Sequence, residues 1–192
     1  MLDRYATRVD TAVKTDHPIL AGSEVAILQF ICEQVRTRSV VHHEWGISET
    51  GDSGVPIGTA ILFASGDATK SLAGATLVAK ELGLAPYRVD LSRVVSKYLG
   101  ETEKNLRRLF DAAEEAGAVL LFDEADALFG KRSEVKDSHD RYANISTHVV
   151  SEMIYAFRGI VIISSSRGGE VAPELLRSAC FVLRLGERGT AQ

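Results

Sequence analysis

AVLLFDEADALFG, residues 118–130, is the stretch of the sequence that decides the fold. Its first five residues, 118–122, are all apolar, and this lack of polar alternation is typical of a strand covered by helices on both faces of a parallel sheet. Asp123 and Glu124 follow directly. Ligands in open α/β sheets bind beyond the carboxyl ends of the strands, so we expect this acidic pair to face a binding crevice.

Apolar runs and helical segments alternate through most of the chain. Besides 118–122, the runs expected to be strands are residues 60–64, 87–91, 160–164 and 181–185. The expected helices lie near residues 71–82, 102–116 and 141–156. This alternation predicts an α/β fold in which a mostly parallel sheet lies between two layers of helices, a three-layer α/β/α architecture.

The first part of the chain has a different pattern. In residues 1–45 apolar side chains recur at spacings of three and four, which predicts a short helical N-terminal region of two helices broken at His17 and Pro18. Residues 46–59 are rich in Gly, Ser, Thr and Pro and predict a linker loop. Residues 60–192 would then form the core domain.

Composition excludes several classes of protein. The 192 residues are 45% hydrophobic and 25% charged, with a formal net charge of -4, so no overall basic field draws the chain toward nucleic acid. No apolar stretch approaches the roughly 18 residues of a membrane-spanning helix, and the charged start does not resemble a signal peptide. Cys32 and Cys180 favour buried thiols in a reducing, cytoplasmic compartment. We therefore expect neither a nucleic acid partner nor membrane insertion.

The acidic pair has two interpretations. In a nucleoside triphosphatase the first carboxylate, here Asp123, holds Mg2+ directly or through water, and the second, Glu124, polarises the attacking water. Alternatively, Asp123 caps the helix that follows and Glu124 lies in its first turn, where acidic residues are favoured. Spacing alone leaves both interpretations open.

Three motifs occur together in residues 90–144. FDEAD at 122–126 is of the Walker-B type, and DRYAN at 140–144 is similar to the region around a second pore loop. A tetrad similar to a first pore loop consists of Lys97, Tyr98, Leu99 and Gly100. With these motifs the segment closely resembles the AAA+ ATPases of the protein-remodelling type.

The resemblance implies a P-loop NTPase-like fold, ATP and Mg2+ as cofactors, and a ring of identical or sister subunits that acts on a protein client. Tyr98 would line the channel of the ring and grip an extended polypeptide; alternatively, it packs against the start of the next helix. Arg177 lies in a stretch that resembles the arginine-finger region and joins Asp123 and Glu124 as a candidate catalytic residue. The finger positions themselves hold Ser178 and Cys180.

The phosphate loop departs from the family pattern. A P-loop reads G-x-x-x-x-G-K-[ST], and its glycines allow backbone N–H groups to turn onto the phosphates. This chain has ASGDATKS at 64–71, where Ala64 and Thr69 replace the glycines. Thr69 is β-branched and poorly suited to a positive φ. The candidate nucleotide-binding residues are Ser65, Gly66, Asp67, Ala68, Thr69, Lys70, Ser71 and Ser166, and Ser71 would ligate the metal with Asp123.

The register of this loop is open. An ungapped comparison with the family puts the lysine position on Ser71 and the hydroxyl position on Leu72, so that Lys70 comes one residue early. Asp67 adds a charge that would repel phosphate. Ser166 stands where the family commonly has an asparagine sensor, and we expect no helical lid of the family type after the last strand.

Two functions follow from these observations. The first is an AAA+ ATPase domain that binds ATP-Mg2+ and remodels or threads a protein client, with weak hydrolysis. The alternative is a noncatalytic AAA+-like interaction subunit that has lost turnover. A Rossmann-like binding module is disfavoured, because no G-x-G-x-x-G follows a strand.

Overall fold

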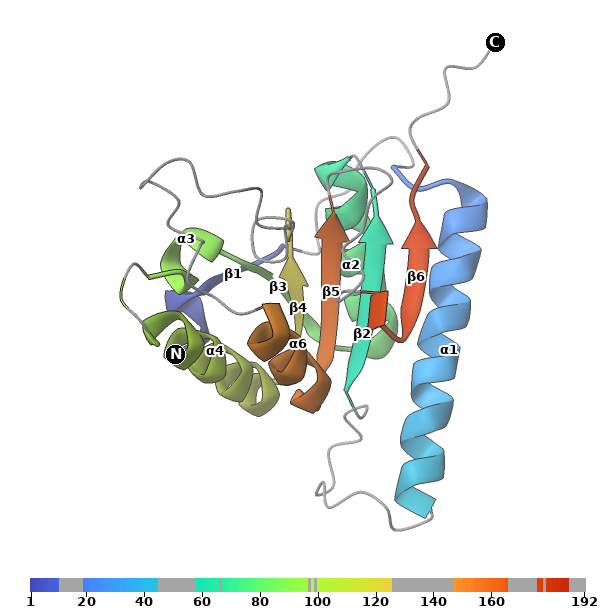
Figure 1. Ribbon diagram of the computed structural model, residues 1–192. Helices are drawn as coiled ribbons and strands as arrows, with labels where there is room; N and C mark the ends of the chain where they lie inside the picture. Colours follow the sequence, from blue (N-terminus) through green and yellow to red (C-terminus); the bar gives the residue numbers. More distant parts are fainter. Residues whose placement is uncertain are drawn as a thin grey trace.

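A six-stranded sheet forms the centre of the molecule (Figure 1). The computed structural model describes residues 1–10, 19–44, 58–65, 67–96, 98, 100–125, 147–165, 176–177 and 179–186. The strands are β1 (Ala6–Arg8), β2 (Thr59–Ala64), β3 (Ala85–Val89), β4 (Ala118–Phe122), β5 (Ile160–Ser165) and β6 (Phe181–Arg184). Their order is β1-β3-β4-β5-β2-β6; neighbours pair in parallel except β1, which pairs antiparallel with β3. The mostly parallel sheet is confirmed.

Helices cover both faces of the sheet. The helices are α1 (Gly22–Glu44), α2 (Ala68–Leu82), α3 (Leu91–Val94), α4 (Glu101–Ala116) and α6 (Thr147–Ala156), besides a 3-10 turn η1 (Leu2–Arg4). Figure 1 shows α4 and α6 in front of the sheet and α2 behind it. Leu120 packs in the core under α4 and α6, whereas Leu121 packs in the core under α1 and α2. Successive residues of β4 therefore enter opposite cores, which explains its continuous apolar run.

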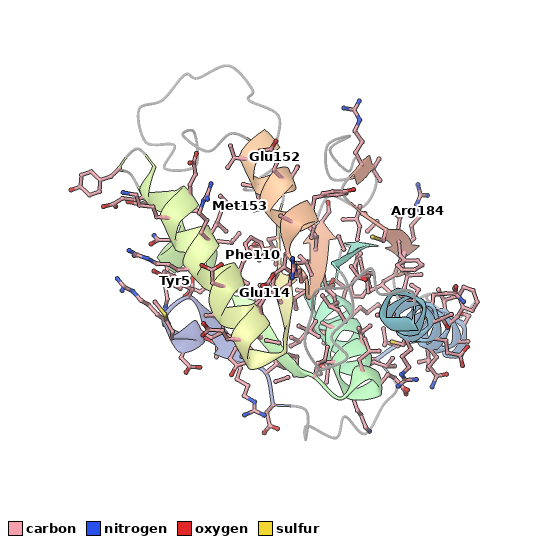
Figure 2. The ribbon with its side chains drawn as sticks, turned by 90° about the horizontal axis from the view of Figure 1, so that it is seen from below. Tyr5, Phe110, Glu114, Glu152, Met153 and Arg184 are labelled. Atoms are coloured by element: carbon pink, nitrogen blue, oxygen red, sulfur yellow. The ribbon has the colours of Figure 1, made fainter. Side chains whose placement is uncertain are left out.

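Aromatic side chains fix α4 and α6 to the sheet. The Phe110 ring of α4 lies 5.0 Å from the Phe157 ring at the end of α6 and 6.0 Å from the Phe122 ring of β4. Figure 2 shows Phe110 and Met153 between the two helices. These ring contacts hold α4 against β4 and against the end of α6.

The helix predicted at the start of the chain is present only as the short 3-10 turn η1, residues 2–4, and is wrong for residues 6–8, which form strand β1. The side chains of Leu2 and Tyr5 are buried, and Ala6 pairs with Val89 of β3. The N–H of Asp90 also donates to the carbonyl of Tyr5, at 2.9 Å. Hydrogen bonds from the sheet edge thus override the helical spacing of the apolar residues.

The second predicted helix is confirmed as α1, residues 22–44. The predicted break at residues 17–18 lies outside the described residues, as does the predicted linker up to residue 57. Thr59 is already paired in strand β2, so the strand begins one residue before the predicted boundary. The division into an N-terminal region, a linker and a core remains a prediction.

Two further expectations concern membrane-spanning helices and the burial of the two cysteines. Within the described residues no helix has the length and apolar character needed to cross a membrane. Cys32 is buried as expected, and burial raises the pKa of its thiol to about 11. Cys180 is exposed, so the expectation of two buried thiols is wrong for this residue.

Candidate functional site

The carboxyl ends of β2, β4 and β5 bring the predicted site together. Phe122 pairs with Ile163, so Asp123 comes next to Ser164, and Ala64 pairs with Ser165 on the other side of β5. The N–H of Ser65 extends this pairing by donating to the carbonyl of Ser165, at 3.3 Å. The acidic pair and the start of the predicted phosphate loop therefore lie at one edge of the sheet, separated by β5.

Asp123 is buried, with 8% of its surface exposed, and both of its carboxylate oxygens accept hydrogen bonds from neighbouring strands. Ser164 Oγ of β5 donates to Oδ1 at 2.6 Å, and Arg88 Nη2 of β3 donates to Oδ2 at 2.7 Å. A buried carboxylate requires such partners. Arg88 therefore supplies the positive charge beside Asp123.

Arg88 and Ser164 were not predicted as site residues. Arg88 lies in the predicted strand 87–91, and Ser164 ends the predicted strand 160–164. Only the pairing of β3 and β5 with β4 places both beside Asp123. The signal in the sequence was a charged residue, Arg88, inside a predicted strand, and its partner could not be read from that signal.

Glu124 has a left-handed backbone conformation. Its φ is 53°, and it is the only residue other than glycine with a positive φ in the described part of the chain. Residues 123–125 form a turn in which the N–H of Glu124 donates to Ser164 Oγ at 3.3 Å. The alternative that Glu124 lies in the first turn of a helix is therefore wrong.

Replacing Glu124 with glycine is expected to raise the free energy of unfolding by up to about 1 kcal/mol, because the left-handed conformation costs an L-residue about 1–2 kcal/mol and glycine loses part of that gain through its freer unfolded chain. Glu124→Ala is the matched control, since it removes the carboxylate and keeps the strain. Urea denaturation of the two variants measures the difference. Equal stabilities would show that the turn is not strained.

The predicted phosphate loop is a short helix cap. Only residues 65–67 separate β2 from α2, which begins earlier than predicted because Asp67 caps it. Asp67 Oδ1 accepts the N–H of Thr69 at 2.8 Å and that of Lys70 at 3.4 Å. Thr69 lies in the first turn of the helix, so the strain expected at a positive φ does not arise there. The N–H groups that would face a phosphate are bonded to the chain's own carboxylate.

Lys70 is buried and points to α1 and the end of β6. Its Nζ donates to Glu24 Oε1 at 3.1 Å and Oε2 at 3.5 Å, and also to the carbonyl of Gly186. Glu24 in turn accepts the N–H of Gly186 at 2.9 Å and that of Ala21 at 2.7 Å, as the acidic member of a capping box does. We call Lys70, Glu24 and Gly186 the Lys70 clamp. It joins α1, α2 and the segment after β6, and it occupies the ammonium group with hydrogen bonds to Glu24 and to the carbonyl of Gly186.

The Lys70 clamp also sets the pKa of Glu24. Burial of the carboxyl raises its pKa, but hydrogen bonds from the N–H of Ala21, from Lys70 and from the N–H of Gly186 lower it more, so the pKa of Glu24 lies below its ordinary value. A carboxyl with a lowered folded pKa adds stability that is fully present above its unfolded pKa, about 4.3, and is lost as the pH falls through the folded pKa.

We therefore expect acid to destabilise the wild type more than Glu24→Gln. The stability advantage of the wild type over this variant should be constant above about pH 5 and shrink below about pH 4.3. Urea denaturation at a series of pH values measures it. Parallel profiles of the two proteins would show that Glu24 ionises alike in the folded and unfolded chains.

Leu72 takes the place on α2 that faces the acidic pair. It lines a cavity of about 470 Å³ together with Arg8, Arg88, Asp123 and Glu124. Ser71 is buried, and its Oγ bonds to the carbonyl of Asp67 at 3.4 Å. This arrangement agrees with the register in which Leu72 holds the hydroxyl position, and an isobutyl side chain cannot ligate Mg2+.

These residues do not fit a magnesium nucleotide as they stand. The N–H groups at the start of α2 are bonded to Asp67, Lys70 is held in its clamp, and both oxygens of Asp123 are bonded to Arg88 and Ser164. Within the described residues no group of three or more His, Cys, Asp or Glu could hold a metal ion.

The other predicted site residues are only partly described. Gly66, Lys97, Leu99 and Ser166 lie outside the described residues. Ala68 is exposed on the first turn of α2, and Arg177 is exposed as well. Tyr98 is 60% exposed. Two residues later Gly100, with a φ of 75°, is the N-cap of α4. The structure therefore places one aromatic ring of the predicted pore loop at the surface, as expected.

A strand-loop-helix turn after β2 and an acidic pair after β4, two strands away, define the P-loop NTPase-like class of α/β proteins. A sequence model described as "ATPase family associated with various cellular activities (AAA)" matches residues 69–186, and the chain belongs to this family. The family expected from residues 90–144 is confirmed.

Three curated relatives cover parts of the chain. "Uncharacterized AAA family ATPase y4kL" of Sinorhizobium fredii is 28% identical over 130 residues, which are 68% of this chain and 37% of that protein. "ATPase family gene 2 protein" of Schizosaccharomyces pombe is 34% identical over 102 residues, 52% of this chain and 13% of that protein. "Cell division cycle protein 48 homolog" of Archaeoglobus fulgidus is 32% identical over 111 residues, 54% of this chain and 14% of that protein. This chain thus matches only a minor part of the length of each.

One solved structure supports the fold. It is described as "Structure of E. coli MS115-1 HORMA:CdnC:Trip13 complex" and superposes with a TM-score of 0.66. The match covers 96% of this chain and 71% of that chain at 19% identity. At this identity the likeness shows the fold alone.

Proposed function

We infer that this chain is a noncatalytic AAA+ subunit of a protein-remodelling assembly, one that keeps the family fold without turning over ATP. The observation that carries this proposal is the position of Lys70. A phosphate loop needs its lysine on the phosphates, whereas the ammonium of Lys70 is buried in the Lys70 clamp, with only 6% of its side chain exposed.

The proposed role is to contact partner subunits and a protein client in the cytoplasm. The remodelling assignment is supported by the relatives, which include a cell division cycle protein 48 homolog, and by a structural neighbour from a complex of several proteins. The contact with a client would involve Tyr98, because an exposed aromatic ring before α4 offers apolar and stacking contacts to an extended polypeptide. The net charge of -4 gives no support to a nucleic acid partner.

The competing function is an ATPase that binds ATP-Mg2+ and hydrolyses it weakly. It is favoured by one observation, the acidic pair that follows β4 and lines the cavity with Leu72. Binding there would require Arg88 to leave Asp123 and Asp67 to release the start of α2. Each of these steps removes a hydrogen bond to an ionised group, so the arrangement opposes binding.

Phosphate release with Mg2+-ATP separates the two functions. We expect the wild type and Glu124→Gln to release phosphate at the same background rate. The full chain is tested with and without an unfolded polypeptide such as casein, because a client could stimulate turnover. Turnover near one per second that Glu124→Gln abolishes would rule out the noncatalytic function.

Tyr98→Ala is expected to weaken binding of fluorescently labelled casein at least about fivefold, because an aromatic contact contributes about 1 kcal/mol or more at a recognition surface. The free energy of unfolding should stay within about 0.5 kcal/mol of the wild type, since the side chain is mostly exposed. Fluorescence anisotropy measures the binding. Tyr155→Ala is the matched control, because Tyr155 is 84% exposed on α6. Equal losses in the two variants would contradict a specific role for Tyr98.

A further inference from the structure

We propose that Asp67 and Arg88 are built-in replacements for the phosphate and for the divalent cation of a nucleotide, and that they hold the site in one conformation without a ligand. This inference rests on the proposed noncatalytic function and states how the chain does without ATP. It is carried by two separate contacts, one at the start of α2 and one at the end of β4.

Asp67 supplies the anion. The start of a helix attracts negative charge, because its first N–H groups are unpaired and the helix dipole is positive there. The carboxylate of Asp67 accepts the N–H groups of Thr69 and Lys70, which are two of the groups that a phosphate would use. The backbone of Asp67 is itself fixed by Ser65, whose Oγ accepts its N–H at 3.1 Å and bonds to its carbonyl at 3.1 Å. The anion is therefore held on a short, internally bonded loop.

Arg88 supplies the cation. Asp123 has 6% of its side chain exposed, whereas Arg88 has 52% exposed, so the guanidinium reaches in from solvent to a buried carboxylate. Its Nη2 lies 2.7 Å from Oδ2 of Asp123, and Ser164 occupies Oδ1. A metal ion at Asp123 would need one of these oxygens and would repel the guanidinium beside it.

With these two contacts the chain itself supplies an anion at the start of α2 and a cation beside Asp123. Leu72 lies between them in sequence and lines the cavity beside Arg88 and Asp123, so this side of the site is apolar where a metal-binding hydroxyl would stand. In an assembly, such a subunit would present the same surface to its neighbours whatever the ATP concentration. The residues that produce this fixed state are Asp67 and Arg88.

The test removes the charges of Asp67 and Arg88 and measures whether the site then binds magnesium pyrophosphate more tightly. Magnesium pyrophosphate is titrated into the wild type and into the double variant Asp67→Gly, Arg88→Gln by calorimetry. Glycine remains an acceptable N-cap residue, and glutamine keeps a donor near Asp123 without the charge. We expect the double variant to bind at least about tenfold more tightly than the wild type, a change of about 1.4 kcal/mol.

An exposed acid and base at the other end of α2 give the matched control. Arg36 of α1 pairs with Glu81 at 3.9 Å, near the C-terminal end of α2 and outside the lining of the cavity. Arg36→Gln, Glu81→Gln should bind pyrophosphate no better than the wild type. If the double variant of the site fails to fold by circular dichroism, Asp67→Asn and Arg88→Gln are titrated singly, and each should still gain affinity.

The proposal is overturned if the folded variants bind no more tightly than the wild type, or if the control variant gains as much. Either result leaves the proposed function standing, because that function depends on phosphate release by the wild type. Conversely, ATP turnover by the wild type would remove the proposed function whatever the variants bind.

Discussion

Replacing Lys70 with methionine is expected to lower the free energy of unfolding by about 3–5 kcal/mol, the usual cost of removing one partner of a buried ion pair. The side chains of Lys70 and Glu24 are 6% and 10% exposed. Without the ammonium, the Glu24 carboxylate would remain buried with only the N–H groups of Ala21 and Gly186 as donors. Urea denaturation followed by circular dichroism measures the loss.

Lys80→Met is the matched control, because Lys80 lies on the same helix and is exposed. Its effect should stay within about 0.5 kcal/mol. The double variant Lys70→Met, Glu24→Gln should lose less than the sum of the two single variants, because it leaves no buried charge without a partner. A Lys70→Met variant as stable as Lys80→Met would show that Lys70 is free to move to the phosphate loop.

Phe110→Ala is expected to cost about 3–5 kcal/mol as well, because it leaves a cavity where α4, α6 and β4 meet. Phe110 is 5% exposed, and its ring contacts those of Phe122 and Phe157. Urea denaturation measures this loss, and Phe30→Ala is the matched control, because Phe30 is 57% exposed on α1. Equal losses at the two positions would contradict the packing described for α4.

The position of α4 bears on the proposed function because Tyr98 lies two residues before Gly100, the N-cap of this helix. Besides Phe110, two polar contacts hold it: Tyr5 Oη donates to Asn105 Oδ1 at 3.1 Å, and the N–H of Arg158 donates to Glu114 Oε1 at 2.8 Å. Figure 2 shows Tyr5, Phe110 and Glu114 along this helix. Because these contacts hold α4 without Tyr98, we expect Tyr98→Ala to weaken client binding and to leave the fold intact.

The apolar strands could be predicted from the sequence because a strand buried on both faces consists of consecutive apolar residues. Residues 118–122 form β4 with the predicted bounds, since a strand covered on both faces needs no partner information to be recognised. β1 could not be predicted, because three residues carry little pattern and their conformation depends on pairing with β3, about 80 residues later.

The position of the candidate site could be predicted from the sequence, but the contacts between its residues could not. Asp123 follows β4 as expected, but its partner Arg88 is 35 residues away in the chain. Lys70 meets Glu24 across 46 residues and Gly186 across 116. Motif spacing gives a lysine near the phosphate loop, whereas the direction of its side chain depends on where α1 and β6 pack. In the sequence, Asp67 and Thr69 indicated that this loop differs from the phosphate-loop pattern of the family.

If residues of this chain occupy the places of the nucleotide, Mg2+-ATP does not stabilise the fold, and thermal unfolding with Mg2+-ATP tests this most directly. A ligand present at about 100 times its dissociation constant adds about 2.7 kcal/mol of stability, which raises the Tm of a protein of this size by about 5–10 °C. We predict the same Tm for the wild type with and without millimolar Mg2+-ATP. A rise of about 5 °C or more would contradict the account, because it would show that ATP displaces Asp67 and Arg88 from the site.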